Sequence, residues 1–349
     1  MKNKKILVIL MLVFSLLLVG CGKQEEPKQE EPKKEETKIE EPEKEEPVKE
    51  VSKFKIFDTT SKNRPFAIVV NNTPVAVKVQ EGVTKAYLVY EFPTEGFTSR
   101  LMALFKDVPT LTVGTIRSCR HNFIDFAQEN DAVLVCYGWS HYAKDELEQQ
   151  KIAYINGISS RWSSLFWRSN PEKLASEHTA YTSIEKVYNY AKGHNYRLTS
   201  DKSRVLNYTP EEVNLNNMNK AITANTVTLP YGNITTVFKY DKNTKEYVKY
   251  VNNKEIKDHN TGEHITTKNI IIQKITYKMA SDHYYWDLHT TGTGDGYYIT
   301  NGYAVPIKWS KKTRDSKSIY TYLDGKEIEV NDGRTYIEVH TTKKKHSIK

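Results

Sequence analysis

Residues 66–70, Phe66-Ala67-Ile68-Val69-Val70, form a continuous apolar run that Asn71-Asn72 ends. A short unbroken run of this kind, rich in β-branched residues, predicts a strand buried on both faces. We predict similar strands at residues 85–92 and 132–137. Ser118 is in position to cap a helix that runs to about Asn130, and Ser183 or Thr182 to cap another that Gly193 ends. Strands that alternate with helices indicate an α/β domain at residues 54–213.

The second half of the chain has a different pattern of residues. Short runs of Thr, Tyr, Val and Ile alternate with turn sequences such as Asn301-Gly302, Asp324-Gly325 and Asp332-Gly333. Turns of this type favour antiparallel hairpins. We therefore expect a mainly antiparallel β domain at residues 214–340, a junction within residues 197–219, and a basic tail at residues 341–349 that frays. The predicted fold is thus a two-domain α+β or α/β protein. The predicted strands are 235–240, 270–277, 284–289, 297–300, 303–308, 319–323 and 335–340.

The amino terminus resembles a bacterial lipoprotein signal. Three lysines precede the apolar residues 6–19, and Leu18-Val19-Gly20-Cys21 follows the pattern of a lipidation site. The apolar stretch is shorter than the about 20 residues of a membrane-spanning helix. We therefore interpret residues 1–21 as a signal peptide and Cys21 as the residue that receives diacylglycerol and palmitate chains. This predicts a location on the outer face of the cytoplasmic membrane, with the membrane as a partner through the lipid anchor.

Residues 22–53 consist largely of Glu, Lys and Pro. Because almost nothing apolar is present to offset the entropy of ordering, we expect a disordered tether. The whole chain has a formal net charge of +8, and this acidic tether leaves the rest more basic still. A basic head suits anionic wall polymers or lipid headgroups, although surface solvation alone explains excess lysine equally well.

The most unusual local chemistry is in Gly114-Thr115-Ile116-Arg117-Ser118-Cys119-Arg120. It places two guanidinium groups at the predicted start of a helix, where the helix dipole disfavours cations. Free backbone amides together with Arg117, Ser118 and Arg120 would bind a phosphate or a carboxylate, with Arg100 as a third cation.

The alternative is an internal counter-ion. Glu91 follows Tyr90 at the end of a predicted strand and is the obvious candidate. Glu91 is then either a structural partner of the arginines or a general acid or base beside them. No catalytic residue is otherwise identified.

Apart from Cys21, the chain contains two cysteines, Cys119 and Cys136. They can form at most one disulfide bond with each other, so no disulfide framework supports the fold. The flanking arginines would lower the pKa of the Cys119 thiol, but no Cys–His–Asn signature accompanies it. His283, Asp287 and His289 share one face of a predicted strand, and at most two of them can meet one ion. We expect no metal and no cofactor.

Aromatic residues are concentrated in the second half. Tyr284, Trp286, Tyr298 and Trp309 are candidates for a surface that stacks on sugar rings, although ordinary half-buried strand positions explain them as well. Nucleic acid is not an expected partner, because no binding motif is present.

The order of these motifs resembles a known family. The matching segments are 64–72, Tyr90-Glu91, 96–100, Phe105, 114–120, 166–168, 178–182, Tyr231, 269–272, 292–294, Asn301-Gly302, Lys308-Trp309 and 333–337. Together they are similar to the YerB-like lipoproteins of Gram-positive bacteria, the DUF3048 family. The resemblance implies an amino-terminal and a carboxy-terminal domain on a lipidated tether and supplies no reaction. The family commonly has a small residue at the position of Cys119 and Trp at that of Tyr336.

The sequence therefore predicts a non-enzymatic lipoprotein of the cell envelope that binds an anionic envelope component, a wall glycan or an envelope protein. The alternatives are a cell-envelope hydrolase or wall-remodelling enzyme that uses Glu91, and a regulatory scaffold for another wall enzyme.

Overall fold

Strand β1 (Phe66–Asn71) is buried along its whole length, as its apolar run predicts. It pairs in antiparallel fashion with β3 (Thr98–Phe105) and in parallel with β5 (Val133–Cys136). The computed structural model describes residues 54–202 and 206–349. The predicted signal peptide, Cys21 and the tether lie outside the described residues.

An eleven-stranded sheet contains strands from both halves of the described chain. Strand β23 (Thr335–Thr341) lies between β2 (Leu88–Thr94) and β16 (Asn269–Ile275) and is parallel to both. The described residues belong to one compact unit, so the two-domain arrangement is not confirmed. The other strands of this sheet are β6 (Tyr154–Asn156), β10 (Ile222–Thr223), β19 (Gly292–Thr300), β20 (Tyr303–Lys311) and β21 (Ile319–Thr321).

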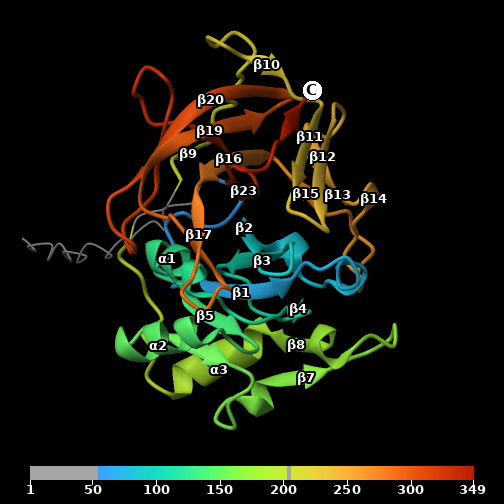
Figure 1. Cartoon of the computed structure of the whole chain (residues 1–349), viewed down its shortest axis with the longest axis vertical. Helices are drawn as coiled ribbons and strands as arrows, with labels where there is room; N and C mark the ends of the chain where they lie inside the picture. Colours follow the sequence, from blue (N-terminus) through green and yellow to red (C-terminus); the bar gives the residue numbers. More distant parts are fainter. Residues whose placement is uncertain (1–53, 203–205) are drawn as a thin grey trace, which may run out of the picture. The chain divides into compact units, whose positions relative to one another are not determined.

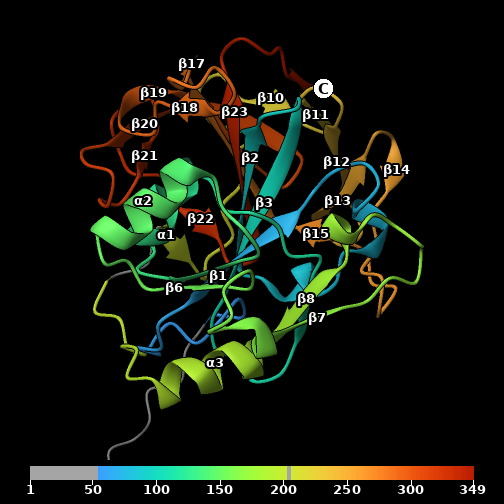
Figure 2. The same cartoon turned by 60° about the horizontal axis from the view of Figure 1, so that its bottom comes forward.

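Both faces of the sheet are covered (Figures 1 and 2). Alternate residues of β1 point to opposite sides, so Ile68 enters one apolar core and Val69 the other. Helices α1 (His121–Glu129) and α2 (His141–Gln149) pack into the Val69 core. Helix α3 (Ile184–Gly193) and a six-stranded sheet pack into the Ile68 core. The six strands are β11 (Thr226–Pro230), β12 (Thr235–Asp241), β13 (Glu246–Val251), β14 (Lys254–Glu255), β15 (Thr266–Thr267) and β24 (Ser347–Ile348).

Two local predictions are confirmed. The Ser183 hydroxyl caps α3 by accepting a hydrogen bond from the Lys186 amide at 3.2 Å. Asn301-Gly302 joins β19 to β20, and both residues have positive φ angles, 51° and 81°, which a tight hairpin turn requires.

The second half is mainly antiparallel, as predicted, and β23 is an exception because it has parallel neighbours on both sides. One other prediction is wrong. The basic tail does not fray, because β24 pairs with β11 through Val227 and Ile348. The remaining short elements are β4 (Thr112–Gly114), β7 (Phe166–Arg168), β8 (Ala180–Ser183), β9 (Tyr208–Thr209), β17 (Tyr277–Met279), β18 (Trp286–Leu288), β22 (Val330–Asn331) and the 3-10 turns Val77–Val79, Val83–Lys85, Ser163–Leu165 and Ser176–His178.

Candidate functional site

Helix α1 begins two residues later than predicted. Arg120 is the residue before its first turn, and no side chain caps it. Ser118 instead donates its hydroxyl to the carbonyl of Tyr137 at 3.2 Å, and its own carbonyl accepts from Arg100 Nη1 at 2.9 Å. The prediction that Ser118 caps this helix is wrong. The backbone around Ser118 stays extended because Arg117 N donates to β1 and Arg117 O accepts from the residue after β5.

Arg100 and Arg120 converge, as expected, but on Glu95 rather than on Glu91. Arg120 Nε donates to Glu95 Oε2 at 2.9 Å, and Arg100 Nη2 donates to Glu95 Oε1 at 3.2 Å. Burial alone would raise the pKa of Glu95, but the Arg120 hydrogen bond and the two positive charges outweigh it and lower that pKa. Burial, then the like charge of Arg120, lower the pKa of Arg100 to about 9. A carboxylate inside the protein therefore bonds both guanidinium groups and offsets one of their two positive charges.

The hairpin β17–β18 covers the same pair. The ring of Tyr285 lies 5.0 Å from the guanidinium carbon of Arg120. Asn122 in α1 donates to Trp286 O at 2.6 Å and accepts from Leu288 N at 3.0 Å. The start of α1 is thus occupied by protein groups, and an open anion site that combines Arg100 and Arg120 is not formed.

Arg117 lies apart from these two, in what we call the strand-end cluster: Asn71, Arg117, Arg168, Glu177 and His178. Arg117 Nη2 donates to Glu177 Oε1 at 3.1 Å, and the Glu177 side chain is 54% exposed. Arg117 Nε is buried and has no hydrogen-bond partner in the described structure. The cluster lies where β1 and β5 end, which is the edge at which parallel strands commonly bind ligands.

His178 has a defined tautomer in this cluster. The Thr73 amide donates to Asn71 Oδ1 at 3.2 Å, so Asn71 Nδ2 is the group that donates to His178 Nδ1 at 2.8 Å. The proton of the neutral ring is therefore on Nε2, which lies 3.7 Å from Glu177 Oε1. Burial and the nearby Arg117 lower the pKa of His178, although Glu177 opposes them, so at neutral pH the ring presents an N–H donor.

Arg168 borders the cluster from β7. Its Nη1 donates to Thr179 Oγ1 at 3.1 Å and to Ser176 O, and its guanidinium carbon lies 4.8 Å from the ring of Tyr137. The Arg117 guanidinium and the His178 N–H therefore face the exposed Glu177 carboxylate, and Arg168 holds the neighbouring residues Ser176 and Thr179. Neither Arg168 nor His178 was predicted as a site residue; the signal was their place in the family motifs at 166–168 and 178–182.

Glu91 lies in the core between the two large sheets. Its Oε1 accepts from Asn72 at 3.0 Å, Ser99 at 2.6 Å and Thr236 at 2.8 Å. Its Oε2 pairs with Lys249 Nζ at 3.1 Å, and neither side chain is more than 1% exposed. The expectation that Glu91 pairs with the arginines is wrong, and its charged partner is Lys249.

Glu338 lies beside Glu91, across the β2–β23 pair. Tyr231 donates its hydroxyl to Glu338 Oε2 at 2.7 Å, and Oε1 is buried without a partner in the described residues. Burial, followed by the negative charge of Glu91, raises the pKa of Glu338 well above its ordinary value. This carboxyl is therefore favoured in its neutral form.

The predicted aromatic surface is only half formed. Tyr284 is 58% exposed, and Trp286 is partly exposed and stacks on Tyr277 at 4.5 Å. Tyr298 and Trp309 are buried, so their assignment to a surface is wrong. Their polar atoms bond inside the protein, Tyr298 Oη to Asn269 Oδ1 at 3.0 Å and Trp309 Nε1 to Lys274 O at 2.9 Å.

Cys119 and Cys136 are buried and unbonded to each other as a disulfide. Burial and a hydrogen bond with Cys136 raise the pKa of Cys119 well above its ordinary value. The expectation of a lowered pKa at this thiol is therefore wrong, because burial outweighs the arginines. Within residues 54–202 and 206–349, no three His, Cys, Asp or Glu side chains lie close enough to hold a metal ion.

Comparison with known proteins places these features in a family. Residues 55–197 match the amino-terminal domain of DUF3048, described as a protein of unknown function, and residues 226–337 match its carboxy-terminal domain. The chain is 29% identical over 283 residues to "Putative lipoprotein YerB" of Bacillus subtilis (strain 168), covering 80% of this chain and 82% of that protein. The crystal structure of YerB from Bacillus subtilis superimposes with a TM-score of 0.69 at 26% identity, over 82% of this chain and 94% of that one. In the described part of the chain, no helix has both the length and the apolar character needed to span a membrane.

Because both the amino-terminal and the carboxy-terminal family domains match, the chain belongs to the DUF3048 family.

Proposed function

We propose that the chain is a lipid-anchored binding protein on the outer face of the cytoplasmic membrane, with Cys21 as the lipidated residue. Its strand-end cluster binds an anionic group, a phosphate or a carboxylate, of an envelope polymer. The similarity to a protein named as a lipoprotein and the signal-like residues 1–21 support the anchoring.

One observation supports the binding site most strongly. Arg117 Nε is a buried donor that no described group satisfies, and among the described residues the carboxylate that pairs with this guanidinium is the exposed one of Glu177. An ion pair at such exposure contributes about 0–1 kcal/mol, so an incoming anion can replace Glu177 at little cost. A bidentate anion there would accept from Arg117 and from His178 Nε2–H together.

The wall-remodelling hypothesis has less support from the geometry. An acid–base catalyst must reach substrate, whereas Glu91 is fully buried and already accepts from four donors. Of the residues predicted for a glycan-binding surface, Tyr284 and Trp286 are accessible. Phe97 lies beside them: its ring is 6.3 Å from that of Trp286, and the residue is 58% exposed. We propose this aromatic group as a secondary contact for the same polymer.

Cosedimentation with purified, phosphate-bearing wall polymer tests the binding site. The full-length chain should bind, and Arg117→Ala should weaken binding by about tenfold, the loss expected of one charge-assisted contact. Arg161→Ala is the matched control, because it removes an exposed guanidinium that donates to Tyr190 on another part of the protein. If Arg117→Ala and Arg161→Ala bind the polymer equally well and have unchanged melting temperatures, the strand-end cluster is not the binding site.

A further inference from the structure

A cavity of about 250 Å³ lies at the end of the large sheet where β1 begins, whereas the strand-end cluster lies where β1 ends. We call it the amino-edge pocket, because it opens where β1 and β2 begin, at Pro65 and Leu88. Asn71 of the strand-end cluster ends β1, so the length of that strand, roughly 20 Å, separates the two places. The amino-edge pocket is therefore an independent site.

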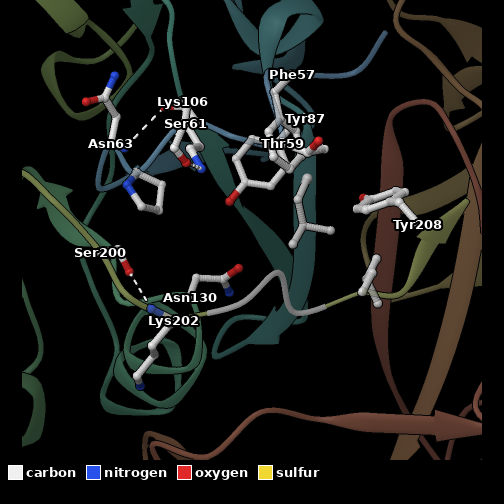
Figure 3. Close-up of a pocket in the computed structure, with 13 residues that line it drawn as sticks. Phe57, Thr59, Ser61, Asn63, Tyr87, Lys106, Asn130, Ser200, Lys202 and Tyr208 are labelled. Carbon is white, nitrogen blue, oxygen red and sulfur yellow. Dashed lines mark hydrogen bonds between the residues drawn. The ribbon is translucent and has the colours of Figure 1, made fainter. Parts of the chain in front are cut away.

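The walls of the pocket differ in chemistry (Figure 3). Phe57, Tyr87 and Tyr208 lie toward one side, and Asn63, Ser200 and Asn130 toward the other. The Phe57 ring lies 4.8 Å from that of Tyr87 and 6.3 Å from that of Tyr208. Aromatic surface opposed by amide and hydroxyl groups suits a ligand with an apolar face and a polar rim.

Two polar atoms in the pocket have no protein partner among the described residues. Asn130 uses its Nδ2 to donate to Tyr90 at 2.9 Å and to Phe126 O at 2.8 Å, which leaves Oδ1 as an available acceptor. The Tyr87 hydroxyl makes no hydrogen bond with a described group, and Figure 3 shows this hydroxyl and the Asn130 amide directed into the cavity. Burial raises the pKa of Tyr87, so its hydroxyl keeps its proton and can donate. A donor and an acceptor thus converge on one space.

Lys106 supplies a positive charge at the rim. Its Nζ donates to Ser61 O at 2.7 Å and lies 5.1 Å from the centre of the Phe57 ring. The nearby Asp107 is turned toward Ser61 and Asn63, with which it bonds at 2.9 and 2.6 Å, and it does not line the pocket.

We propose that the amino-edge pocket binds a single sugar unit. Its volume is below the about 300–1,000 Å³ of sites for drug-sized ligands, so it fits one ring rather than a chain. The ring packs its C–H face on Tyr87 and Phe57, one hydroxyl accepts from Tyr87 Oη, and another donates to Asn130 Oδ1. Lys106 favours a sugar with an acidic substituent.

Saturation-transfer NMR and titration on the full-length chain test the proposal with four probes: glucose, glucuronate, glucose 6-phosphate and cyclohexanol. We expect the sugars to bind more tightly than cyclohexanol, and the two acidic sugars more tightly than glucose. The ratio between the two acidic sugars distinguishes a carboxylate from a phosphate substituent.

Tyr87→Phe removes only the hydroxyl and should weaken sugar binding by about three- to tenfold, the effect of one lost hydrogen bond. Tyr250→Phe, a matched hydroxyl deletion on β13, should leave it unchanged. Absence of sugar binding, cyclohexanol binding as tight as glucose, or equal affinity of parent and Tyr87→Phe would each overturn the proposal. Arg117→Ala should leave the affinity for sugars unchanged. A loss of polymer binding at the strand-end cluster can therefore be told apart from a loss of sugar binding in the pocket.

Discussion

Replacing Lys249 by methionine removes one partner of a fully buried ion pair and keeps most of the side-chain volume. The Lys249 and Glu91 side chains are 1% and 0% exposed, and their charged atoms lie 3.1 Å apart. The substitution leaves the Glu91 carboxylate in the core with three neutral donors and no counter-ion. It also removes the ammonium that lies 5.0 Å from the ring of Tyr336.

An uncompensated buried charge costs about 3–5 kcal/mol. We therefore expect Lys249→Met to lower the free energy of unfolding by that amount. Lys245→Met is the control, because Lys245 pairs with Glu212 at 2.9 Å but both side chains are about half exposed. Such a pair contributes about 0–1 kcal/mol. The double variant Glu91→Gln with Lys249→Met should be more stable than Lys249→Met alone, because no charge is left buried.

Urea unfolding of the full-length variants, followed by tryptophan fluorescence, measures these differences. A loss in Lys249→Met no larger than that in Lys245→Met would refute the reasoning, since it would mean that the Glu91 carboxylate does not need its counter-ion.

Three further predictions concern other buried groups. Because burial raises the pKa of Glu338, the folded chain holds this proton to higher pH than the unfolded chain does, and stability is lost as pH rises above the ordinary glutamate pKa of about 4.3. Glu338→Gln should therefore flatten the dependence of the unfolding free energy on pH between about 5 and 8; an unchanged slope would contradict this. Glu95→Gln should lower the free energy of unfolding by about 3 kcal/mol, because two buried guanidinium groups lose their counter-ion, whereas Glu177→Gln should change it by less than about 1 kcal/mol; similar losses in the two would contradict it. A thiol reagent should leave Cys119 and Cys136 unmodified in the folded chain and modify both in urea, as mass spectrometry would show; rapid labelling of either in the native chain would be inconsistent with their burial.

Local signals in the sequence were sufficient for several elements. The apolar run at 66–70 predicts β1, Ser183 predicts the start of α3, and Asn301-Gly302 predicts the β19–β20 turn. Each of these depends on residues that are neighbours in the chain.

Long-range pairing could not be predicted in this way. Thr335 pairs with Leu88, and nothing near either residue in the sequence specifies the other. The pairing decides that β23 is parallel to its neighbours and that both halves share one sheet. The aromatic assignments failed for a related reason: because the sheet is covered on both faces, strand periodicity does not tell an exposed Tyr298 from a buried one.

The arginine site was predicted in part. The sequence pattern predicts correctly that Arg100 and Arg120 lie together, but it indicates Glu91 as their counter-ion, whereas the structure has Glu95. Glu95 stands in the turn between β2 and β3, five residues before Arg100, so the hairpin itself carries its carboxylate to the arginine. Recognising that turn would have identified Glu95. Arg117 diverges from the others because its backbone is held between β1 and β5, a contact that no local pattern reveals.

The central place of β23 has a consequence for the order of assembly. This strand ends at Thr341 of 349 residues, yet it fills the middle of the large sheet. Until it has been synthesised, β2 and β16 each carry an open edge with unsatisfied amides and carbonyls. A chain that lacks β23 therefore has no route to the native sheet. Premature termination near the carboxyl end should accordingly yield aggregates or degraded fragments rather than a smaller folded product.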